Sequence, residues 1–363
     1  MKSSIQELAW KLWRRRGGLV GRILSVLLLP AEGFWRMAMS VRNQYFDRQC
    51  QYCIHGFPVV SVGNLAVGGT GKTPITSWIV SELRKAGSRP AILQGNSGAD
   101  EALLHYHWTP RVPVLVEGDR RLSLKKAKEV GADIAILDDG FQHRRVGRQV
   151  DLVVLAAEDD FSSPLLPRGP FREPVSALKR ADAVVITRRT ASYRDAEELG
   201  QRLLPVLSSG CVLGSLRFET ARLTPLRNFP GIGDISQGLG PSEEVTLSNT
   251  SMGSEAGWKP LMENVLVLTA VGRSENVIAT VGELTTGSVD MLSFADHYRF
   301  TEEDVTAARE RAGSRPILVT EKDAVKLTSF AGLMTQCYVV EQQLVWDWGQ
   351  NDVRSLLQHK AVT

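Results

Sequence analysis

Residues 57–76 read FPVVSVGNLAVGGTGKTPIT, and this stretch decides the fold. It begins with an apolar β-branched run at residues 59–62, passes through a glycine-rich turn and ends in a segment with helical character. This order predicts a phosphate-binding loop, because the glycines let backbone N–H groups fold around an anion and the helix N-terminus adds partial positive charge. The strict pattern has glycine where this chain has Ala66. A glycine-rich loop without a ligand is the alternative.

The loop carries the residues that a nucleotide requires. Lys72 would reach the β- and γ-phosphates, and the hydroxyl of Thr73 would ligate Mg²⁺. ATP and Mg²⁺ are therefore the expected cofactors. The expected nucleotide-binding residues are Gly68, Gly69, Thr70, Gly71, Lys72 and Thr73.

From residue 58 onward, apolar β-branched runs alternate with helical segments. This alternation predicts an α/β fold of the P-loop NTPase type, with a mostly parallel sheet flanked by helices. Ligands of such sheets bind at the carboxyl ends of the strands. The expected strands are residues 59–62, 91–93, 112–116, 134–137, 151–156, 183–187, 211–218, 265–270, 291–294, 316–320 and 337–340. The expected helices are residues 74–86, 122–130, 194–204, 274–284 and 301–312, the last capped by Thr301.

A chain of 363 residues suggests two domains or one large α/β unit. We divide it into an N-terminal segment (1–50), a P-loop nucleotide-binding core (51–230), a linker or surface excursion rich in Gly and Ser (231–260), and a smaller C-terminal α/β part that completes the active site (261–363).

The N-terminal residues 7–48, Glu7–Arg48, are predicted to form a basic amphipathic helix. Residues 1–48 contain nine Lys or Arg and three Asp or Glu, although the whole chain has a net charge of only +3. The most apolar piece, residues 23–29, is far shorter than the roughly 20 residues of a membrane span. Trp10, Trp13, Phe34 and Trp35 are typical of a membrane interface. The segment fits a helix in the bilayer surface, with arginines on anionic headgroups.

Two alternatives apply to this segment. One is a helix packed on the protein's own core with a solvated basic face, and the other is a cleaved signal peptide, which lacks a clear cleavage site here. Cys50 and Cys53 could form half of a zinc site or a redox pair, but no second ligand pair follows, so we interpret the four cysteines as reduced thiols.

The second half of a nucleotide site follows the strand at residues 134–137. Asp138 and Asp139 stand where a P-loop protein holds Mg²⁺, and two adjacent carboxylates are costly unless a cation compensates them. A solvated turn is the alternative. Gln142 and His143, directly after, could donate to phosphate or orient a hydroxyl.

Three further segments carry candidate residues. Residues 164–174, PLLPRGPFREP, combine rigid prolines and apolar side chains with Arg168 and Arg172, which suit a substrate with an anionic head and acyl chains. An ordinary proline-rich connection is the alternative. Asp296 and His297 follow a predicted strand and could form an acid/base pair, although such a histidine is more often structural. Residues 320–323, TEKD, could close over a nucleotide or begin a helix with an acidic first turn.

These motifs in this order resemble one family, the tetraacyldisaccharide 4′-kinases, which are the lipid A 4′-kinases of Gram-negative bacteria. The resemblance rests on residues 61–74 (SVGNLAVGGTGKTP), 138–143 (DDGFQH), 165–174, 294–300 (FADHYRF) and 319–326, and it covers most of the chain. It implies transfer of the ATP γ-phosphate to the 4′-hydroxyl of a tetraacylated, 1-phosphorylated glucosamine disaccharide. It also implies a peripheral protein at the cytoplasmic face of the inner membrane, with no nucleic acid and no obligate protein partner.

The resemblance also implies roles for individual residues. Asp100 and His297 would activate the acceptor hydroxyl, with Lys72 and Asp139 in the catalytic centre. The implied metal ligands are Thr73, Asp138, Asp139 and Glu173. The implied substrate contacts are Asn64, Gln142, His143, Arg168 and Arg172. The chain departs from the family at residues 94–100, where a longer loop with Ser-Arg-Gly-Tyr-Gly is usual.

Two other functions are compatible with these motifs. One is a membrane-associated P-loop ATPase switch that works with a protein partner, although the early signature lysine of such switches is absent. The other is a non-catalytic lipid-binding relative, which would have no need of the complete set of Mg-ATP residues.

Overall fold

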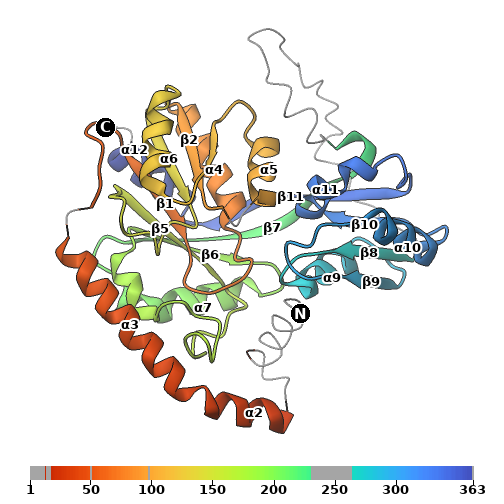
Figure 1. Ribbon diagram of the computed structural model, residues 1–363, viewed down its shortest axis with the longest axis horizontal. Coiled ribbons are helices and arrows are strands. Elements are labelled where there is room, and N and C mark those ends of the chain that lie inside the picture. Colours follow the sequence, from red (N-terminus) through yellow and green to blue (C-terminus); the bar gives the residue numbers. More distant parts are fainter. Residues whose placement is uncertain (1–12, 14–17, 50, 97–98, 230–263, 362–363) are drawn as a thin grey trace. The chain divides into compact units, whose positions relative to one another are not determined.

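The computed structural model describes residue 13 and residues 18–49, 51–96, 99–229 and 264–361. The chain forms two compact units (Figure 1). The first comprises Met1–Glu219 and Gln343–Thr363, and the second comprises Thr220–Gln342. Strands β7 (Val212–Pro225) and β11 (Cys337–Trp348) each run from one unit into the other. The residues after Gln342, which were predicted in the C-terminal part, therefore belong to the first unit.

The first unit contains a parallel sheet, as predicted. Its strands lie in the order β3 (Val114–Val116), β2 (Pro90–Gln94), β4 (Ile134–Asp138), β1 (Val59–Gly63), β5 (Val150–Ala156), β6 (Ala183–Arg188) and β7. Parallel neighbours end at the same edge of a sheet, and Val62 of β1 is in register with Asp138 of β4. The glycine-rich loop and the acidic strand end therefore lie side by side.

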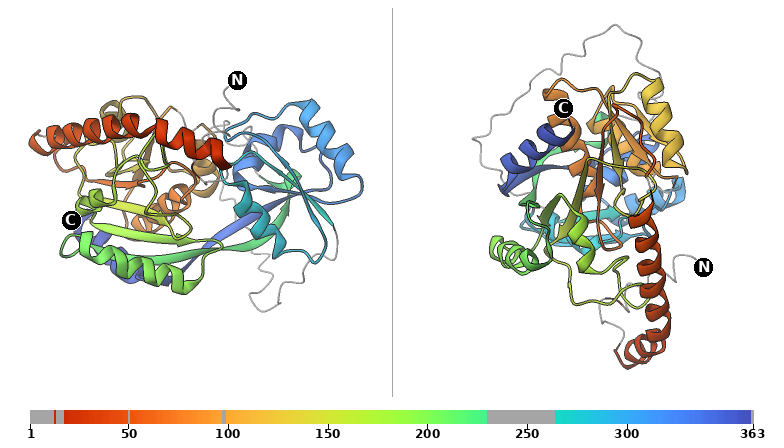
Figure 2. Two further views of the ribbon diagram at one scale, coloured as in Figure 1. Left: turned by 90° about the horizontal axis from the view of Figure 1, so that it is seen from below. Right: turned by 90° about the vertical axis from the view of Figure 1, so that its left-hand side faces the viewer.

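Helices cover both faces of this sheet (Figures 1 and 2). Successive residues of a strand point to opposite faces. Val60 and Val62 accordingly pack in one core with α4 (Lys72–Lys85) and α12 (Gln350–Ala361), while Val59 packs in another with α6 (Arg120–Glu129). Helix α7 (Tyr193–Leu203) packs on β5 and β6 in a third cluster.

Two helices of the first unit were not predicted, α5 (Ala99–Trp108) and α12. The apolar residues of α5 are adjacent instead of spaced every three or four positions, and its last turn contains two histidines and a tryptophan, which are weak helix formers. Packing on the sheet rather than local preference stabilises it. Short 3₁₀ helices cover Val175–Arg180, Leu204–Val206, Leu226–Asn228 and Thr328–Phe330.

The second unit is a smaller α/β arrangement, as predicted. Its parallel strands lie in the order β11, β10 (Ile317–Thr320), β8 (Val265–Thr269) and β9 (Val289–Ser293). Helix α9 (Ser274–Gly282) packs on β8 and β9, and α10 (Glu302–Ala312) begins at the predicted cap, where Thr301 and Asp304 form a capping box. The predicted excursion at residues 231–260 lies outside the described residues.

Helices α2 (Gly18–Leu27) and α3 (Leu29–Arg48) confirm the helical character predicted for the described part of the N-terminal segment. In the part of the chain that the structure describes, no single helix has the length and apolar content of a membrane span. Helices α2 and α3 satisfy both criteria only as a pair, and they are bent by 48° relative to each other.

Candidate active site

The loop between β1 and α4 has the backbone of an anion-binding turn. Gly68 and Gly71 have φ angles of 116° and 91°, a region that favours glycine. Space also requires glycine at position 71, because a Cβ there would lie 2.5 Å from the ring of Phe218. Helix α4 begins at Lys72, directly after the turn, so its N-terminal N–H groups are available to an anion at the end of the loop.

Three hydrogen bonds at Thr70 hold the loop in this shape. The N–H of Thr70 donates to the carbonyl of Gly68 at 3.0 Å, and the hydroxyl of Thr187 donates to the carbonyl of Thr70 at 2.9 Å. The amide Nδ2 of Asn64 donates to the Thr70 hydroxyl at 3.1 Å. Asn64 is fully buried. Its amide therefore supports the loop, and the predicted contact of Asn64 with the substrate stays a prediction.

Asp139 faces the loop from the end of β4. Its φ angle of 57° is left-handed, a conformation that aspartate tolerates better than most residues. Its Oδ1 lies 3.7 Å from Nζ of Lys72, and its Oδ2 lies 2.9 Å from Nη1 of Arg172. Burial would raise the pKa of Asp139, but the charges of Lys72 and Arg172 outweigh it and hold the pKa at about 2. Three residues chosen from the sequence thus form one charged cluster.

Asp138 has a different partner. Its carboxylate is buried, and Oδ2 lies 2.8 Å from Nε2 of His105, a fully buried residue of α5. Nδ1 of His105 lies 3.3 Å from the hydroxyl of Ser77 on α4. Sequence reasoning missed His105 and Ser77, because their contacts exist only once α4, α5 and β4 pack together.

Arg120 is a third residue that sequence reasoning missed. It is the first residue of α6, it is 5% exposed, and its Nη1 donates to the carbonyl of Glu117 at 2.8 Å. Gly95 leaves room for it, since a Cβ there would lie 3.0 Å from Nη2. Burial lowers the pKa of Arg120, while the charges of Asp138 and Asp139 oppose that shift. Arg120 therefore supplies positive charge beside the two acids.

Glu173 is fully buried inside a hydrogen-bond network. Its Oε1 accepts from Nε2 of Gln142 and from Arg180, both at 3.2 Å. Its Oε2 accepts from Nδ2 of Asn43 at 2.9 Å and from Arg180 at 3.0 Å. Protein donors contact both oxygens in this structure, and the role of Glu173 as a metal ligand stays a prediction.

Gln142 is the link between this network and the charged cluster. Its Oε1 accepts from Arg172 at 3.2 Å, and its Nε2 also donates to the carbonyl of Asn64 at 2.9 Å. Its amide group therefore orients Arg172, and direct contact with the substrate remains a prediction. His143, the next residue, is exposed and keeps its predicted role as a candidate substrate contact.

Arg168 contacts the N-terminal helices. Its Nη1 donates to Oε2 of Glu32 at 2.8 Å, and its Nε donates to Ser25 at 3.1 Å. Glu32 is the one buried residue of α3. Arg168 therefore attaches the loop at residues 164–174 to the N-terminal helices, and its role in substrate binding stays a prediction.

Asp100 and His297 belong to different units. Asp100 is buried in the first turn of α5, in the first unit. His297, in the second unit, has a φ angle of 62° and its Nε2 lies 3.6 Å from Oδ2 of Asp296. Asp296 also accepts from Lys322 at 3.1 Å. The pairing of Asp100 with His297 stays a prediction.

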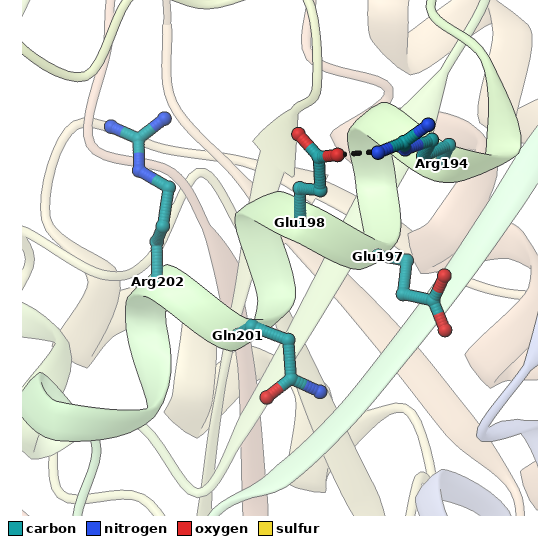
Figure 3. A pocket seen from close by; sticks show the side chains of 5 residues that line it. All are labelled: Arg194, Glu197, Glu198, Gln201 and Arg202. Atoms are coloured by element: carbon teal, nitrogen blue, oxygen red, sulfur yellow. Dashed lines mark hydrogen bonds and ion pairs between the residues drawn. The ribbon is translucent and has the colours of Figure 1, made fainter.

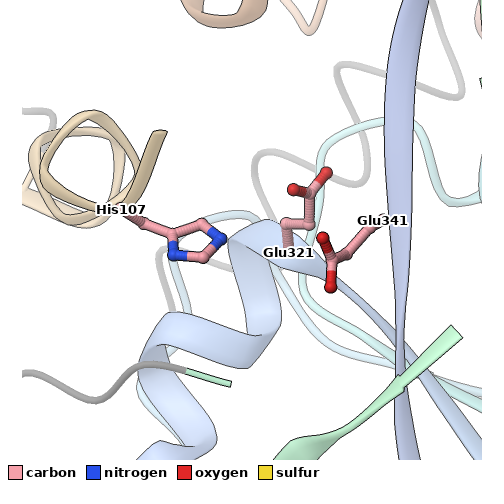
Figure 4. A group of neighbouring side chains, drawn as sticks. All are labelled: His107, Glu321 and Glu341. Atoms are coloured by element: carbon pink, nitrogen blue, oxygen red, sulfur yellow. The ribbon is translucent and has the colours of Figure 1, made fainter. Parts of the chain in front are cut away.

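Of the two interpretations of residues 320–323, the helix start is confirmed. Helix α11 (Glu321–Leu327) begins after Thr320, whose hydroxyl accepts from the N–H of Asp323. Figure 4 shows Glu321 and Glu341, both in the second unit. The N–H of Gln342 donates to Glu321 at 3.2 Å, and Arg222 pairs with Glu341 at 2.7 Å. Both carboxylates thus have structural partners.

A pocket on α7 is separate from this chemistry. It is lined by Arg194, Glu197, Glu198, Gln201 and Arg202, and the first and third of these form an ion pair at 2.8 Å (Figure 3). All five residues lie on one helix, and none of them was chosen as a site residue. The charged cluster at the ends of β1 and β4 is therefore the candidate active site.

The candidate site fits a nucleotide and a divalent cation. Oδ1 of Asp139 is buried and makes no hydrogen bond among the described residues. A buried carboxylate oxygen of this kind is suited to a cation. The hydroxyl of Thr73 and the carboxylates of Asp138 and Asp139 supply oxygen only, which is the ligand type that Mg²⁺ prefers.

Comparison with known proteins identifies related proteins over most of the chain. A sequence profile described as LpxK, tetraacyldisaccharide-1-P 4′-kinase, matches residues 24–95 and 94–361. A tetraacyldisaccharide 4′-kinase of Syntrophus aciditrophicus is 31% identical over 370 residues, which cover 93% of this chain and 94% of that protein. One from Anaeromyxobacter dehalogenans strain 2CP-C is 33% identical over 350 residues, covering 88% and 85%. The crystal structure of LpxK from Aquifex aeolicus in complex with ATP shares the fold, with a TM-score of 0.67, 23% identity and coverage of 93% of this chain and 99% of that one.

Proposed function

This chain belongs to the tetraacyldisaccharide-1-P 4′-kinase family, and on that premise we propose which of its residues carry out the transfer. It is an ATP-dependent kinase that phosphorylates the 4′-hydroxyl of a tetraacylated glucosamine disaccharide 1-phosphate, the lipid A precursor. The observation that carries the assignment of residues is the cluster of Lys72, Asp139 and Arg172 beside the N-terminus of α4.

Lys72 and Arg172 neutralise the phosphates of ATP. Both side chains form ion pairs with the carboxylate of Asp139, which holds them beside the loop before a nucleotide binds. Phosphoryl transfer requires little covalent chemistry from the protein. It depends on positioning of the reacting groups and on stabilisation of the charge in the transition state. Gln142 contributes by orienting Arg172 through its amide oxygen.

Mg²⁺ is the metal that this set of residues would hold. Thr73, Asp138 and Asp139 are the proposed ligands, and Glu173, whose oxygens accept from Gln142, Arg180 and Asn43, stays a predicted fourth. When bound, the ion would supply positive charge that offsets the negative charge developing on the transferred phosphoryl group. Asp100 and His297 remain the proposed pair that activates the acceptor hydroxyl.

The N-terminal helices support a location on a membrane surface. Helix α3 turns its polar side toward the protein, where Asn43 donates to Glu173, Asp47 pairs with Arg144, and Arg42 donates to the carbonyl of Gln142. The opposite side of α2 and α3 exposes large apolar residues, namely Leu19, Val20, Ile23, Val26, Leu27, Leu29, Phe34, Met37, Val41 and Tyr45. Water disfavours such a surface, whereas a bilayer interface would bury it. We therefore place the protein peripherally on the cytoplasmic face of the inner membrane, where its glycolipid substrate would be present.

The experiment that tests this function follows labelled γ-phosphate from Mg-ATP to tetraacyl disaccharide 1-phosphate in mixed micelles. Lys72→Ala should lower turnover by at least about 100-fold, because it removes the charge that meets the transferred group. The matched control is Lys125→Ala, on the exposed side of α6, which should keep full turnover.

Each other outcome contradicts a part of the proposal. Label transfer by Lys72→Ala at the wild-type rate would remove the P-loop from the mechanism. ATP hydrolysis by the wild type that a protein partner stimulates, without label on the lipid, would favour the ATPase switch. Binding of the lipid without transfer or hydrolysis would favour the non-catalytic relative.

A further inference from the structure

We infer that His105 is a positioning residue for the kinase reaction, which together with Ser77 holds the carboxylate of Asp138 in the orientation that meets the cation of Mg-ATP. The inference rests on the proposed function of Asp138. It concerns a histidine that lies in none of the motifs described above.

Three elements of the first unit bring these side chains together. Ser77 lies on α4, His105 on α5 and Asp138 at the end of β4. The distances are 3.3 Å from the Ser77 hydroxyl to Nδ1 and 2.8 Å from Nε2 to Oδ2 of Asp138. Both ring nitrogens of His105 therefore have a partner, although the residue is completely buried.

The direction of the hydrogen bonds from Ser77 through His105 to Asp138 follows from the carboxylate of Asp138. A carboxylate only accepts hydrogen bonds, so Nε2 of His105 is the donor to Oδ2 of Asp138. The Ser77 hydroxyl can donate to Nδ1, and the hydrogen bond at one ring nitrogen determines which nitrogen carries the proton. Ser77 thus selects the form of the ring that donates to Asp138.

The hydrogen bond also determines how Asp138 can bind a cation. With Oδ2 engaged by His105, Oδ1 is the oxygen left for a metal, so the carboxylate would bind through one oxygen in one direction. Groups that hydrogen-bond to metal ligands orient them, and their loss typically weakens metal binding by about 10–100-fold.

Asp138 and Asp139 therefore differ in the groups that contact their carboxylates directly. Asp139 lies between the cations Lys72 and Arg172, which offset its negative charge. The hydrogen bond of Asp138 comes from an imidazole, and α5 encloses that imidazole away from water. Rigid orientation of Asp138 and charge balance at Asp139 are thus provided by separate residues.

The alternative is a histidine that only fills the core between α4, α5 and the sheet. The two interpretations differ in metal binding, which a purely structural histidine would leave unchanged. We would measure binding of Mn²⁺ in the presence of a non-hydrolysable ATP analogue, using the electron paramagnetic resonance signal of free Mn²⁺. Binding of the analogue alone, without metal, is measured in parallel.

His105→Leu should weaken Mn²⁺ binding by about 10–100-fold and leave analogue binding without metal within about twofold of wild type. His105→Gln keeps a donor on a side chain of similar length and should restore most of the affinity. His55→Leu, which removes an exposed histidine, is the matched control and should bind Mn²⁺ as the wild type does. Wild-type Mn²⁺ affinity in a folded His105→Leu protein would overturn the inference.

Ser77→Ala provides the test if His105→Leu fails to fold, because it removes only the outer hydrogen bond. A several-fold loss of Mn²⁺ affinity supports the inference, and unchanged affinity overturns it. Failure of the proposed function would be recognised separately, since the wild type would then show no metal-dependent transfer to the lipid.

Discussion

Asp138 and Asp139 are adjacent in the chain and have separate surroundings. Asp139 turns toward the loop through a left-handed backbone and contacts Lys72 and Arg172. Asp138 is the last residue of β4 and contacts His105 of α5. Two adjacent carboxylates that shared one environment would repel each other, so the change of direction between them allows both to serve the same site.

Glu158 is a carboxylate outside this site that supports the segment before α7. One of its oxygens accepts the N–H groups of Arg189, Thr190 and Ala191 at 2.6, 2.9 and 3.1 Å. Burial would raise the pKa of Glu158, but these hydrogen bonds outweigh it and lower the pKa below its ordinary value of 4.5.

The pKa of Glu158 predicts a contribution to stability that depends on pH. The lowered value means that the folded protein binds fewer protons there, so the contribution is complete above about pH 5 and is lost as pH falls through the folded pKa. Glu158→Gln should lower the free energy of unfolding by about 1–2 kcal/mol at pH 7. Urea titrations at pH 7 and pH 4 measure this, and the variant should lose less stability than wild type between them. An equal loss in both proteins would contradict the role of Glu158.

At the scale of elements, α3 is an amphipathic helix whose polar side faces the protein. Its single buried residue is Glu32, which accepts from Arg168 and from the N–H of Leu165 at 3.3 Å. Trp35 donates from the same side to the carbonyl of Arg172 at 3.0 Å. Hydrogen bonds therefore attach α3 directly to the loop that carries Arg172, and its apolar side is left for another environment.

Two substitutions on α3 should separate these roles. Glu32→Ala leaves Arg168 and the N–H of Leu165 without their partner and should lower the free energy of unfolding by about 2 kcal/mol, with vesicle binding retained. Phe34→Asp, on the exposed side, should retain stability and weaken binding to vesicles of phosphatidylethanolamine and phosphatidylglycerol by about tenfold. Urea unfolding and vesicle sedimentation measure the two effects. The opposite pattern would show that the apolar side packs on the protein.

At the scale of the whole molecule, the chain enters the second unit through β7 and returns through β11. The return places α12 in the first unit, where Val353 and Leu357 are buried in the core beneath β1 and α4. Arg354 of α12 also forms an ion pair with Glu82 of α4. The last helix of the chain therefore stabilises the unit that contains the P-loop.

Leu357→Ala tests this arrangement. The lost side chain leaves a cavity in a fully buried position and should lower the free energy of unfolding of the first unit by about 3 kcal/mol. Gln358→Ala, at the exposed neighbouring position, is the control and should have little effect. Urea unfolding followed through tryptophan fluorescence measures both variants. Equal stability of the two would show that α12 contributes little to the core.

The α/β class, most strands and the P-loop could be predicted from the sequence, because these depend on neighbours in the chain. β-Branched runs form buried strands, closely spaced glycines permit the turn, and a lysine and threonine at its end start the helix. The acidic end of β4 could be predicted in the same way, because its two aspartates directly follow an apolar strand in the sequence.

The partner of each polar side chain, in contrast, depends on how the chain packs in three dimensions. Arg168 and Arg172 lie in one loop and look alike in sequence, yet one contacts Glu32 and the other Asp139. Glu173 is enclosed by donors from residues 43, 142 and 180, and the contact of His105 with Asp138 depends on the packing of α5. Such hydrogen bonds join residues that are distant in the chain, and a buried polar group accepts whichever partner the packing of helices and strands brings within about 3 Å.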